Sequence, residues 1–126
     1  MKQIVLADDD QAALDGLRSL LMAWGYEVNT AQDGRTALAL VNEVRPSVVI
    51  TDVVMPAMSG LELLEAVHRD EPAIPVIVLT AHGTPETRHR AVAHGAFAYV
   101  AKPVDTARLR LLLARAVQGA GGNAQS

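Results

Sequence analysis

The sequence predicts an α/β fold: a doubly wound, five-stranded parallel sheet between two layers of helices, (βα)5. Short apolar runs alternate with amphipathic helical patterns along the chain, which is typical of strands joined by right-handed helical crossovers. Five such units are too few to close an eight-unit barrel. An open sheet is left, and 2-1-3-4-5 is the common strand order for five strands.

Four of the expected strands are short runs that are apolar at successive positions, namely residues 4–7, 48–51, 76–79 and 99–101. Such runs are typical of strands that are buried on both faces of a parallel sheet. Residues 27–31 alternate between polar and apolar side chains, so we expect this strand to lie at an edge of the sheet.

Capping residues and helix stops delimit five helices between and after these strands. The first is expected over residues 11–24 with Gly25 as its stop, and the second starts near Asp33 and ends before Pro46. Ser59 opens the third with a capping-box pattern. The fourth starts at residues 84–86 and stops at Gly95, and the fifth follows residue 105.

The composition describes one compact domain. The chain has 126 residues, of which 50% are hydrophobic and 20% charged, so it can bury a sizeable core. We assign residues 1–118 to this domain. Residues 119–126 have no apolar pattern, and we expect them to be a flexible tail or the start of a linker.

Several classes of protein are disfavoured by the same composition. The absence of cysteine excludes disulfides and thiolate metal sites, and a net charge of −3 without a basic face argues against direct nucleic-acid contact. No apolar run approaches the roughly 18 residues that a membrane span needs, and no secretory signal is recognisable. We therefore expect a cytoplasmic protein without a membrane anchor.

Polar residues follow the apolar strands at the points where the strands end. Asp8–Asp10 come after the first strand, Asp52 ends the third, Thr80 ends the fourth and Lys102 follows the fifth. In an open α/β sheet the ligand crevice lies beyond the carboxyl ends of the strands, where the winding direction changes. All these side chains are therefore expected at one edge of the sheet.

Each of these residues also has an ordinary structural explanation, and for Asp10 a helix cap is the favoured one. Together they favour a different explanation, because clustered carboxylates repel one another and Asp52 stands within an apolar run. Mg²⁺ relieves such repulsion with oxygen ligands, and Lys102 and Thr80 supply a charge and a hydroxyl suited to a phosphoryl group. The pattern predicts a metal-assisted phosphoryl site.

Four motifs in order resemble the receiver domain of bacterial two-component response regulators, which has a flavodoxin-like fold. They are residues 4–10, residues 48–56 with Gly60 beyond, residues 76–81 and residues 99–103. The resemblance covers residues 3–118. It implies that Asp52 accepts a phosphoryl group from a sensor histidine kinase, and that the domain is a self-phosphorylating switch and not a turnover enzyme.

The same resemblance implies roles for the neighbouring residues. Asp9 and Asp52 would ligate Mg²⁺ directly, the backbone carbonyl of Val54 would complete the protein ligands, and Asp8 would act through water. Lys102 would neutralise the phosphoryl group. Thr80 would hydrogen-bond the phosphoryl group. Thr80 and Tyr99 would act as switch residues, with Tyr99 carrying the effect of phosphorylation to the surface.

Residues 80–83 and 95–103 are similar to receivers of nitrogen-regulatory-type transcription activators, although Ala98 departs from that subgroup. The resemblance implies an output domain or partner protein that controls transcription, and we favour a fragment of a longer regulator over a stand-alone receiver. Arginines flank the expected surface of the fourth helix, fifth strand and fifth helix. They are either solvated or form ion pairs across a homodimer; they are Arg88, Arg90, Arg108, Arg110 and Arg115.

Two rival functions fit the sequence less well. A haloacid-dehalogenase-type Mg²⁺ phosphatase would use the spacing of Asp8 and Asp10, but it leaves Asp52 unexplained and generally needs a longer chain. A flavodoxin-like FMN carrier would need a hydroxyl- and glycine-rich phosphate loop after the first strand. The three aspartates found there would repel phosphate without a metal.

Overall fold

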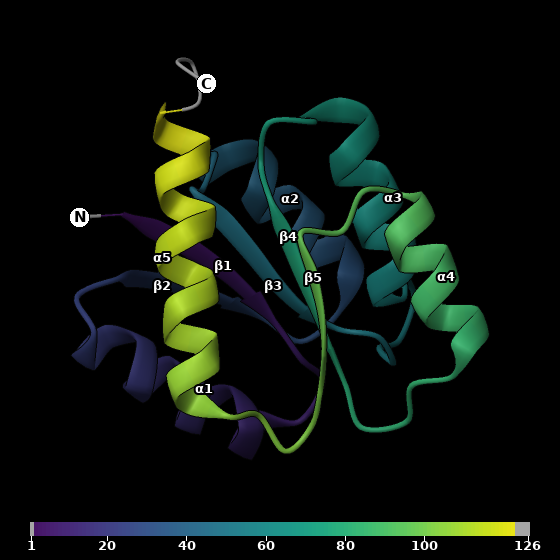
Figure 1. Cartoon of the computed structure of the whole chain (residues 1–126), viewed down its shortest axis with the longest axis horizontal. Coiled ribbons are helices and arrows are strands. Elements are labelled where there is room, and N and C mark those ends of the chain that lie inside the picture. The colour runs from purple at the N-terminus through teal and green to yellow at the C-terminus, as the bar shows by residue number, and fades with distance from the viewer. Residues whose placement is uncertain (1, 123–126) are drawn as a thin grey trace.

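The computed structural model describes residues 2–122, in which five strands and five helices alternate (Figure 1). The strands are β1 (Gln3–Ala7), β2 (Glu27–Ala31), β3 (Val48–Asp52), β4 (Val76–Thr80) and β5 (Ala98–Ala101). The helices are α1 (Gln11–Ala23), α2 (Gly34–Val44), α3 (Gly60–Asp70), α4 (Pro85–Ala93) and α5 (Thr106–Gly122). Among the described residues, no helix is both long and apolar enough to cross a bilayer.

All five strands are parallel and lie in the order β2-β1-β3-β4-β5, which confirms the predicted fold class. The alternating strand, β2, lies at an edge as expected. Leu6 of β1 is opposite Thr30 of β2 and Ile50 of β3. The change of winding direction therefore falls between β1 and β3, and the carboxyl ends of these two strands are neighbours.

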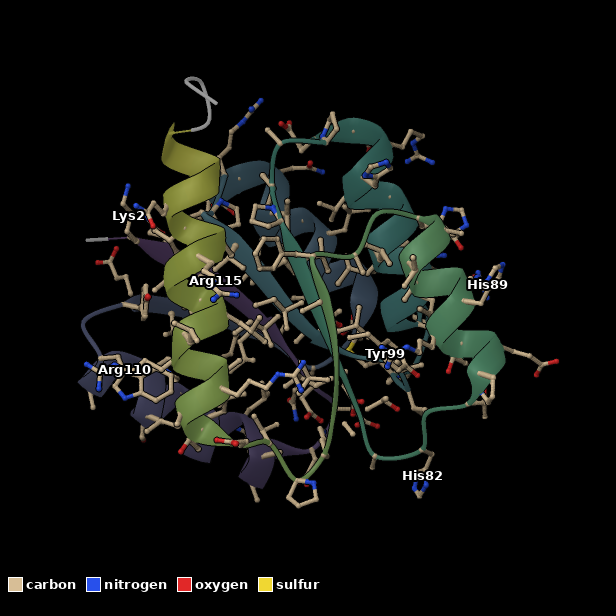
Figure 2. All side chains as sticks on the ribbon, in the orientation of Figure 1. Lys2, His82, His89, Tyr99, Arg110 and Arg115 are labelled. Carbon is tan, nitrogen blue, oxygen red and sulfur yellow. The ribbon has the colours of Figure 1, made fainter. Side chains whose placement is uncertain are left out.

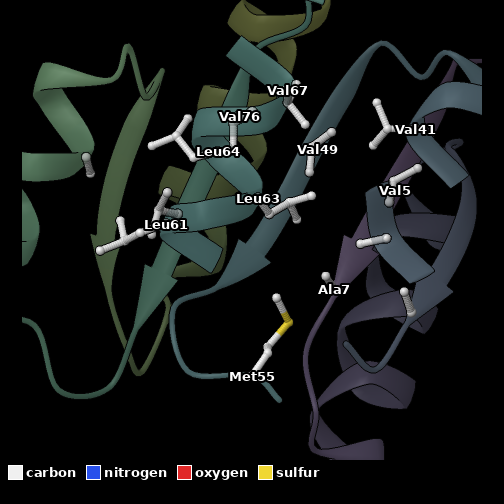
Figure 3. Packing of buried hydrophobic residues seen from close by; sticks show 14 residues of the cluster. Val5, Ala7, Val41, Val49, Met55, Leu61, Leu63, Leu64, Val67 and Val76 are labelled. Carbon is white, nitrogen blue, oxygen red and sulfur yellow. The ribbon is translucent and has the colours of Figure 1, made fainter. Parts of the chain in front are cut away.

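Both faces of the sheet are buried, because successive side chains of a strand point to opposite sides. In β1, Ile4 and Leu6 pack in a cluster with residues of α1 and α5, whereas Val5 packs in a second cluster with residues of α2 and α3. Figure 3 shows the second cluster, with Leu63 and Val67 of α3 facing Val49 of β3 in the sheet. This double burial explains why the inner strands are apolar at successive positions on both faces.

The predicted capping residues begin four of the helices. The side chains of Asp10, Asp33, Ser59 and Thr84 each accept a hydrogen bond from a backbone N–H in the first turn. A glycine with positive φ, 98° at residue 25 and 82° at residue 95, follows α1 and α4. The start and stop signals in the sequence therefore place these helices correctly.

The last helix is longer than the sequence suggested. α5 continues to Gly122, past residue 118, where we expected the domain to end. Extending an existing helix adds one backbone hydrogen bond for each residue that is fixed, so it needs no apolar pattern of its own. The remainder of the expected tail, residues 123–126, lies outside the described residues.

Candidate functional site at the carboxyl edge of the sheet

The polar residues singled out in the sequence lie at one edge of the sheet. Asp8 directly follows β1, Asp52 is the last residue of β3, Thr80 is the last residue of β4 and Lys102 directly follows β5. Asp8 and Thr80 are buried, with 7% and 3% of their surface exposed. Buried polar groups need partners, so their contacts indicate how this site is built.

Three carboxylates meet at this edge, as the sequence predicted. Asp8, Asp9 and Asp52 each offer an oxygen that lies within 4.8 Å of the oxygens of the other two. Asp8 is buried, Asp52 is half-buried and Asp9 is exposed, so the cluster opens to solvent on the side of Asp9. Its oxygens form a group of hard donors of the kind that Mg²⁺ prefers.

Lys102 bridges two of these carboxylates. Its Nζ atom lies 3.0 Å from Oδ2 of Asp8 and 3.3 Å from Oδ2 of Asp52. Burial lowers the pKa of Lys102, but the hydrogen bond that Lys102 donates to Asp8 and the charges of Asp52 and Asp8 outweigh burial and raise the pKa above its ordinary value. The lysine is therefore held charged beside the carboxylates.

The backbone around Asp52 fixes its carboxylate. The N–H of Val53 donates to Oδ1 of Asp52 at 2.8 Å, which leaves Oδ2 facing Lys102. The hydroxyl of Thr51, fully buried, donates to the backbone carbonyl of Asp52 at 2.9 Å. This role of Thr51 was not predicted, although a hydroxyl within an apolar strand was a signal for it.

Helix α3 also presses against this turn. The N–H of Gly60 donates to the carbonyl of Val53 at 2.8 Å, and a Cβ atom on Gly60 would collide with the carbonyl of Asp52. Only a glycine allows this close approach of helix and turn. Val54, the expected carbonyl ligand, lies in the same turn, and the residue is 64% exposed.

Asp10 has a different task from its two neighbours. Its side chain accepts a hydrogen bond from the N–H of Ala12 at 3.1 Å and caps α1, as expected. Its own N–H donates to Oδ1 of Asp8 at 3.0 Å and so orients that buried carboxylate. The carboxylate of Asp10 is therefore used for the helix, and it does not belong to the acidic cluster.

Thr80 and Tyr99 lie beside one another near the end of β4. The hydroxyl of Thr80 accepts a hydrogen bond from the N–H of His82 at 3.1 Å, and the peptide bond between Lys102 and Pro103 is cis. The ring of Tyr99 reaches from β5 towards α4, whereas His82 points away into solvent (Figure 2). The half-buried phenol lies 2.6 Å from the hydroxyl of Thr87 on α4.

Three of the arginines considered for a homodimer have contacts within the chain. Arg90 lies 2.8 Å from Glu65 of α3, and Arg88 lies over the ring of Tyr99. Arg110 lies over the ring of Trp24, on the side of α5 that faces α1 (Figure 2). Sequence spacing did not reveal these contacts, because each joins two different elements whose relative placement depends on the tertiary fold.

The arrangement of these residues is that of a known protein family. Residues 4–114 match the family model of the response regulator receiver domain. The chain belongs to this family. The expectation drawn from the four sequence motifs is therefore confirmed, and the domain is one that takes part in phosphorylation-dependent signalling.

Similar proteins include full-length bacterial regulators. This receiver domain is 37% identical to the regulatory protein AtoC and 39% identical to the transcriptional regulatory protein ZraR, both of Escherichia coli. The two alignments cover 94% and 90% of this chain but only 26% of each relative. The receiver chain thus spans about a quarter of the length of these curated relatives.

Solved receiver structures share its fold over almost the full length. A CheY-like response regulator receiver domain protein from Methanospirillum hungatei superposes with a TM-score of 0.93 at 30% sequence identity. That comparison covers 98% of each chain. The arrangement of the strands and helices is therefore that of a known receiver fold.

Proposed function

We propose that this receiver domain is a Mg²⁺-dependent switch that accepts a phosphoryl group on Asp52 from a sensor histidine kinase. The observation that carries the proposal is the position of Asp52, which ends β3 inside the acidic cluster and beside Lys102. A carboxylate nucleophile, a site for a divalent cation and a fixed positive charge are the parts that phosphoryl transfer requires.

The acidic cluster suits Mg²⁺ by the chemistry of its donors. Asp9 and Asp52 would ligate the ion directly with the backbone carbonyl of Val54, and Asp8 would act through a water molecule. Mg²⁺ takes few carboxylates and keeps several waters, and the exposed side of the cluster at Asp9 leaves room for them. When bound, the ion draws negative charge from the phosphoryl oxygens.

The chain's own residues would carry the transfer itself. An oxygen of Asp52 attacks phosphorus while the bond between phosphorus and the kinase's histidine nitrogen breaks, and the histidine leaves with the bonding electrons. Lys102, now paired with Asp8 and Asp52, would turn its charge to the new phosphoryl group. The hydroxyl of Thr80 would donate a hydrogen bond to it, and Tyr99 would respond to that movement.

The partners of the switch follow from the same proposal. The receiver would take its signal from a sensor histidine kinase in the cytoplasm and would act on an output domain or partner protein, without contacting nucleic acid itself. Transcription is the proposed output, since one relative is named a transcriptional regulatory protein. A nitrogen-regulatory-type regulator is the proposed context.

A homodimer through α4, β5 and α5 remains part of the proposal. Arg108 and Arg115 on α5 are exposed and available for ion pairs with Glu86 or Asp105 of a second copy. Arg90 would first have to leave Glu65. Sedimentation with and without a phosphoryl mimic measures whether activation causes this association.

The alternative hypothesis of a phosphatase is not supported by the contacts of Asp8 and Asp10, the two residues on which it depends. Its metal site would need the carboxylates of Asp8 and Asp10 together, but Asp10 caps α1 and Asp8 is paired with Lys102. The cluster found at this edge combines Asp8 with Asp9 and Asp52 instead. That combination favours an acceptor at Asp52.

The proposal is tested by chemical phosphorylation. Incubation with a small phosphodonor such as acetyl phosphate and Mg²⁺ should add one phosphoryl group, which intact-protein mass spectrometry detects and which base removes, as expected for an acyl phosphate. Asp52→Asn should abolish the added mass. Asp15→Asn, a change at an exposed position of α1, should leave the added mass unaltered. A label that persists in Asp52→Asn would refute the assignment.

A further inference from the structure

The ring of Tyr99 is held from two sides by one turn of α4. Its hydroxyl oxygen lies 2.6 Å from Oγ1 of Thr87, and the guanidinium carbon of Arg88 lies 5.8 Å from the centre of the ring. Figure 2 shows Tyr99 directed from β5 towards this helix. The residue expected to report on the phosphoryl site is thus in direct contact with the amino end of α4.

The hydrogen bond belongs to a small network at the start of α4. The hydroxyl of Thr87 lies 3.0 Å from the carbonyl oxygen of Thr84, to which it can donate its single proton. Oγ1 of Thr87 also accepts the N–H of Thr84 at 2.9 Å, within the capping box that begins α4. Either hydroxyl can donate in the bond between Tyr99 and Thr87, and in both cases the phenol of Tyr99 is a third member of that capping arrangement.

Gly83 makes this position of the phenol accessible. A Cβ atom on residue 83 would lie 2.7 Å from the hydroxyl oxygen of Tyr99 and 3.0 Å from the methyl carbon of Thr80. The first distance is too short to be tolerated, so a side chain at residue 83 would push the phenol away from Thr87. A cleft of about 440 Å³, lined in part by Tyr99 and Arg88, gives the ring room to move.

Helix α4 depends on such contacts because it buries little of itself. Of its residues, all of which the structure describes, only Ala91 is buried. Its carboxyl-terminal end is held by Glu65 of α3, which lies 2.8 Å from Arg90 and 3.2 Å from His94. A helix with so small a buried face is sensitive to the loss of a single anchor at its other end.

We infer that Thr87 is a positioning residue that ties the phenol of Tyr99 to the cap of α4, and that Gly83 keeps the space in which this tie forms. The inference rests on the function proposed above. Movement of Tyr99 then breaks or remakes a hydrogen bond at the start of α4, so a change beside Asp52 alters the order of that helix. Thr87 acts through Tyr99 and does not contact the phosphoryl site.

The tie itself is tested by a double-mutant cycle on the metal-free protein, with urea unfolding as the measurement. Tyr99→Phe should lower the folding equilibrium constant about fivefold when residue 87 is Thr, and by less than about twofold in the Thr87→Val background. Thr36→Val is the matched control, because Thr36 has the same place in the cap of α2, where its hydroxyl bonds Asp33. An equal effect of Tyr99→Phe in both backgrounds would overturn the tie.

The relay is tested by the backbone amide NMR signals of the full chain, with Mg²⁺ and beryllium trifluoride as the phosphoryl mimic. In the wild type, signals of Val53 at the site and of Arg88 and Ala91 in α4 should shift. In Thr87→Val and Gly83→Ala the shift at Val53 should persist, while the shifts in α4 fall by at least about half.

The two possible failures can be told apart. Undiminished α4 shifts in Thr87→Val, with a normal shift at Val53, would overturn the role of Thr87 and leave the phosphoryl site intact. No shift at Val53 in the wild type would overturn the proposed function and the relay together. A purely structural role of Thr87 would lower stability without separating the response of α4 from that of the site.

Discussion

Lys102 is the residue on which the charge balance of the site depends. It is the positive partner of both Asp8 and Asp52, and Asp8 is 7% exposed. We expect Lys102→Met to lower the free energy of unfolding by about 1–3 kcal/mol at neutral pH, because a nearly buried carboxylate loses its charged partner. Lys2→Met, which removes the other lysine of the sequence from an exposed position, should have little effect.

The pH dependence of this difference has a predictable sign. The pKa of Lys102 is raised in the folded protein from its ordinary 10.5, so its contribution to stability is complete below pH 10.5. It is lost as the pH rises through the folded pKa. Urea unfolding should therefore show the gap between wild type and Lys102→Met closing above pH 10.5, and a gap that stays constant there would contradict the prediction.

The sequence predicted the location of a site residue where that residue directly follows or ends a strand. Asp52 and Lys102 follow apolar runs, so the rule that parallel strands end at one edge was sufficient to bring them together. The bond between Thr87 and Tyr99 could not be predicted this way. It depends on how far α4 leans over β5, and neither residue stands at a strand end or in a known spacing.

Two glycines show how differently one residue type acts at the level of a helix. Gly16 lies in the middle of α1, and a Cβ atom there would meet nothing within 4 Å. Gly16→Ala should raise the free energy of unfolding by about 0.5–1 kcal/mol, because alanine loses less backbone freedom in a helix. Gly60→Ala should lower it, since its Cβ atom would collide with the carbonyl of Asp52.

Thermal or urea unfolding of the two glycine variants measures this contrast. Opposite signs are expected, and a loss of stability in Gly16→Ala would show that the open space beside α1 is needed by the fold. Helix propensity alone ranks the two glycines alike, although Gly60 also belongs to one of the four sequence motifs. Sequence patterns distinguish helix from strand, but they do not report how closely the first turn of α3 approaches the backbone of β3.

The elements themselves were largely predictable, because caps and stops act locally. Ser59 and Thr84 begin α3 and α4 where the sequence placed them, through bonds within a single turn. The end of α5 was not predictable in this way. Residues 119–122 follow no apolar pattern in the sequence, and the helix continues through them as an extension of a well-packed segment that includes Leu109 and Leu113.

The stability of the whole molecule should respond to the acidic cluster. In the metal-free protein Asp9→Asn removes one of three neighbouring negative charges, so we expect a rise in melting temperature of roughly 2–4 °C. The same change should weaken the stabilisation by Mg²⁺, since a ligand that binds the folded state more weakly stabilises it less at a given concentration. Scanning calorimetry at several Mg²⁺ concentrations measures both effects.

Glu43→Gln is the control for this comparison, because it removes an exposed carboxylate from α2, away from the cluster. It should change neither the melting temperature nor the response to Mg²⁺ appreciably. A lower melting temperature in Asp9→Asn, together with an unaltered response to Mg²⁺, would mean that Asp9 neither repels its neighbours nor holds the ion.

The parallel direction of the strands also determines on which side of the molecule the chain can be joined to a support or a fusion partner. β1 begins at the sheet edge opposite to Asp52 (Figure 1). Gly119, in the last part of α5, lines a pocket with Pro75, which directly precedes β4 at that same edge. Strands of four or five residues, at about 3.3 Å per residue, separate the two edges by roughly 13–17 Å. A bead, a sensor chip or a fluorescent protein joined at either end would therefore leave the acidic edge open to the surrounding solution, so immobilised receivers would keep their reactive side accessible.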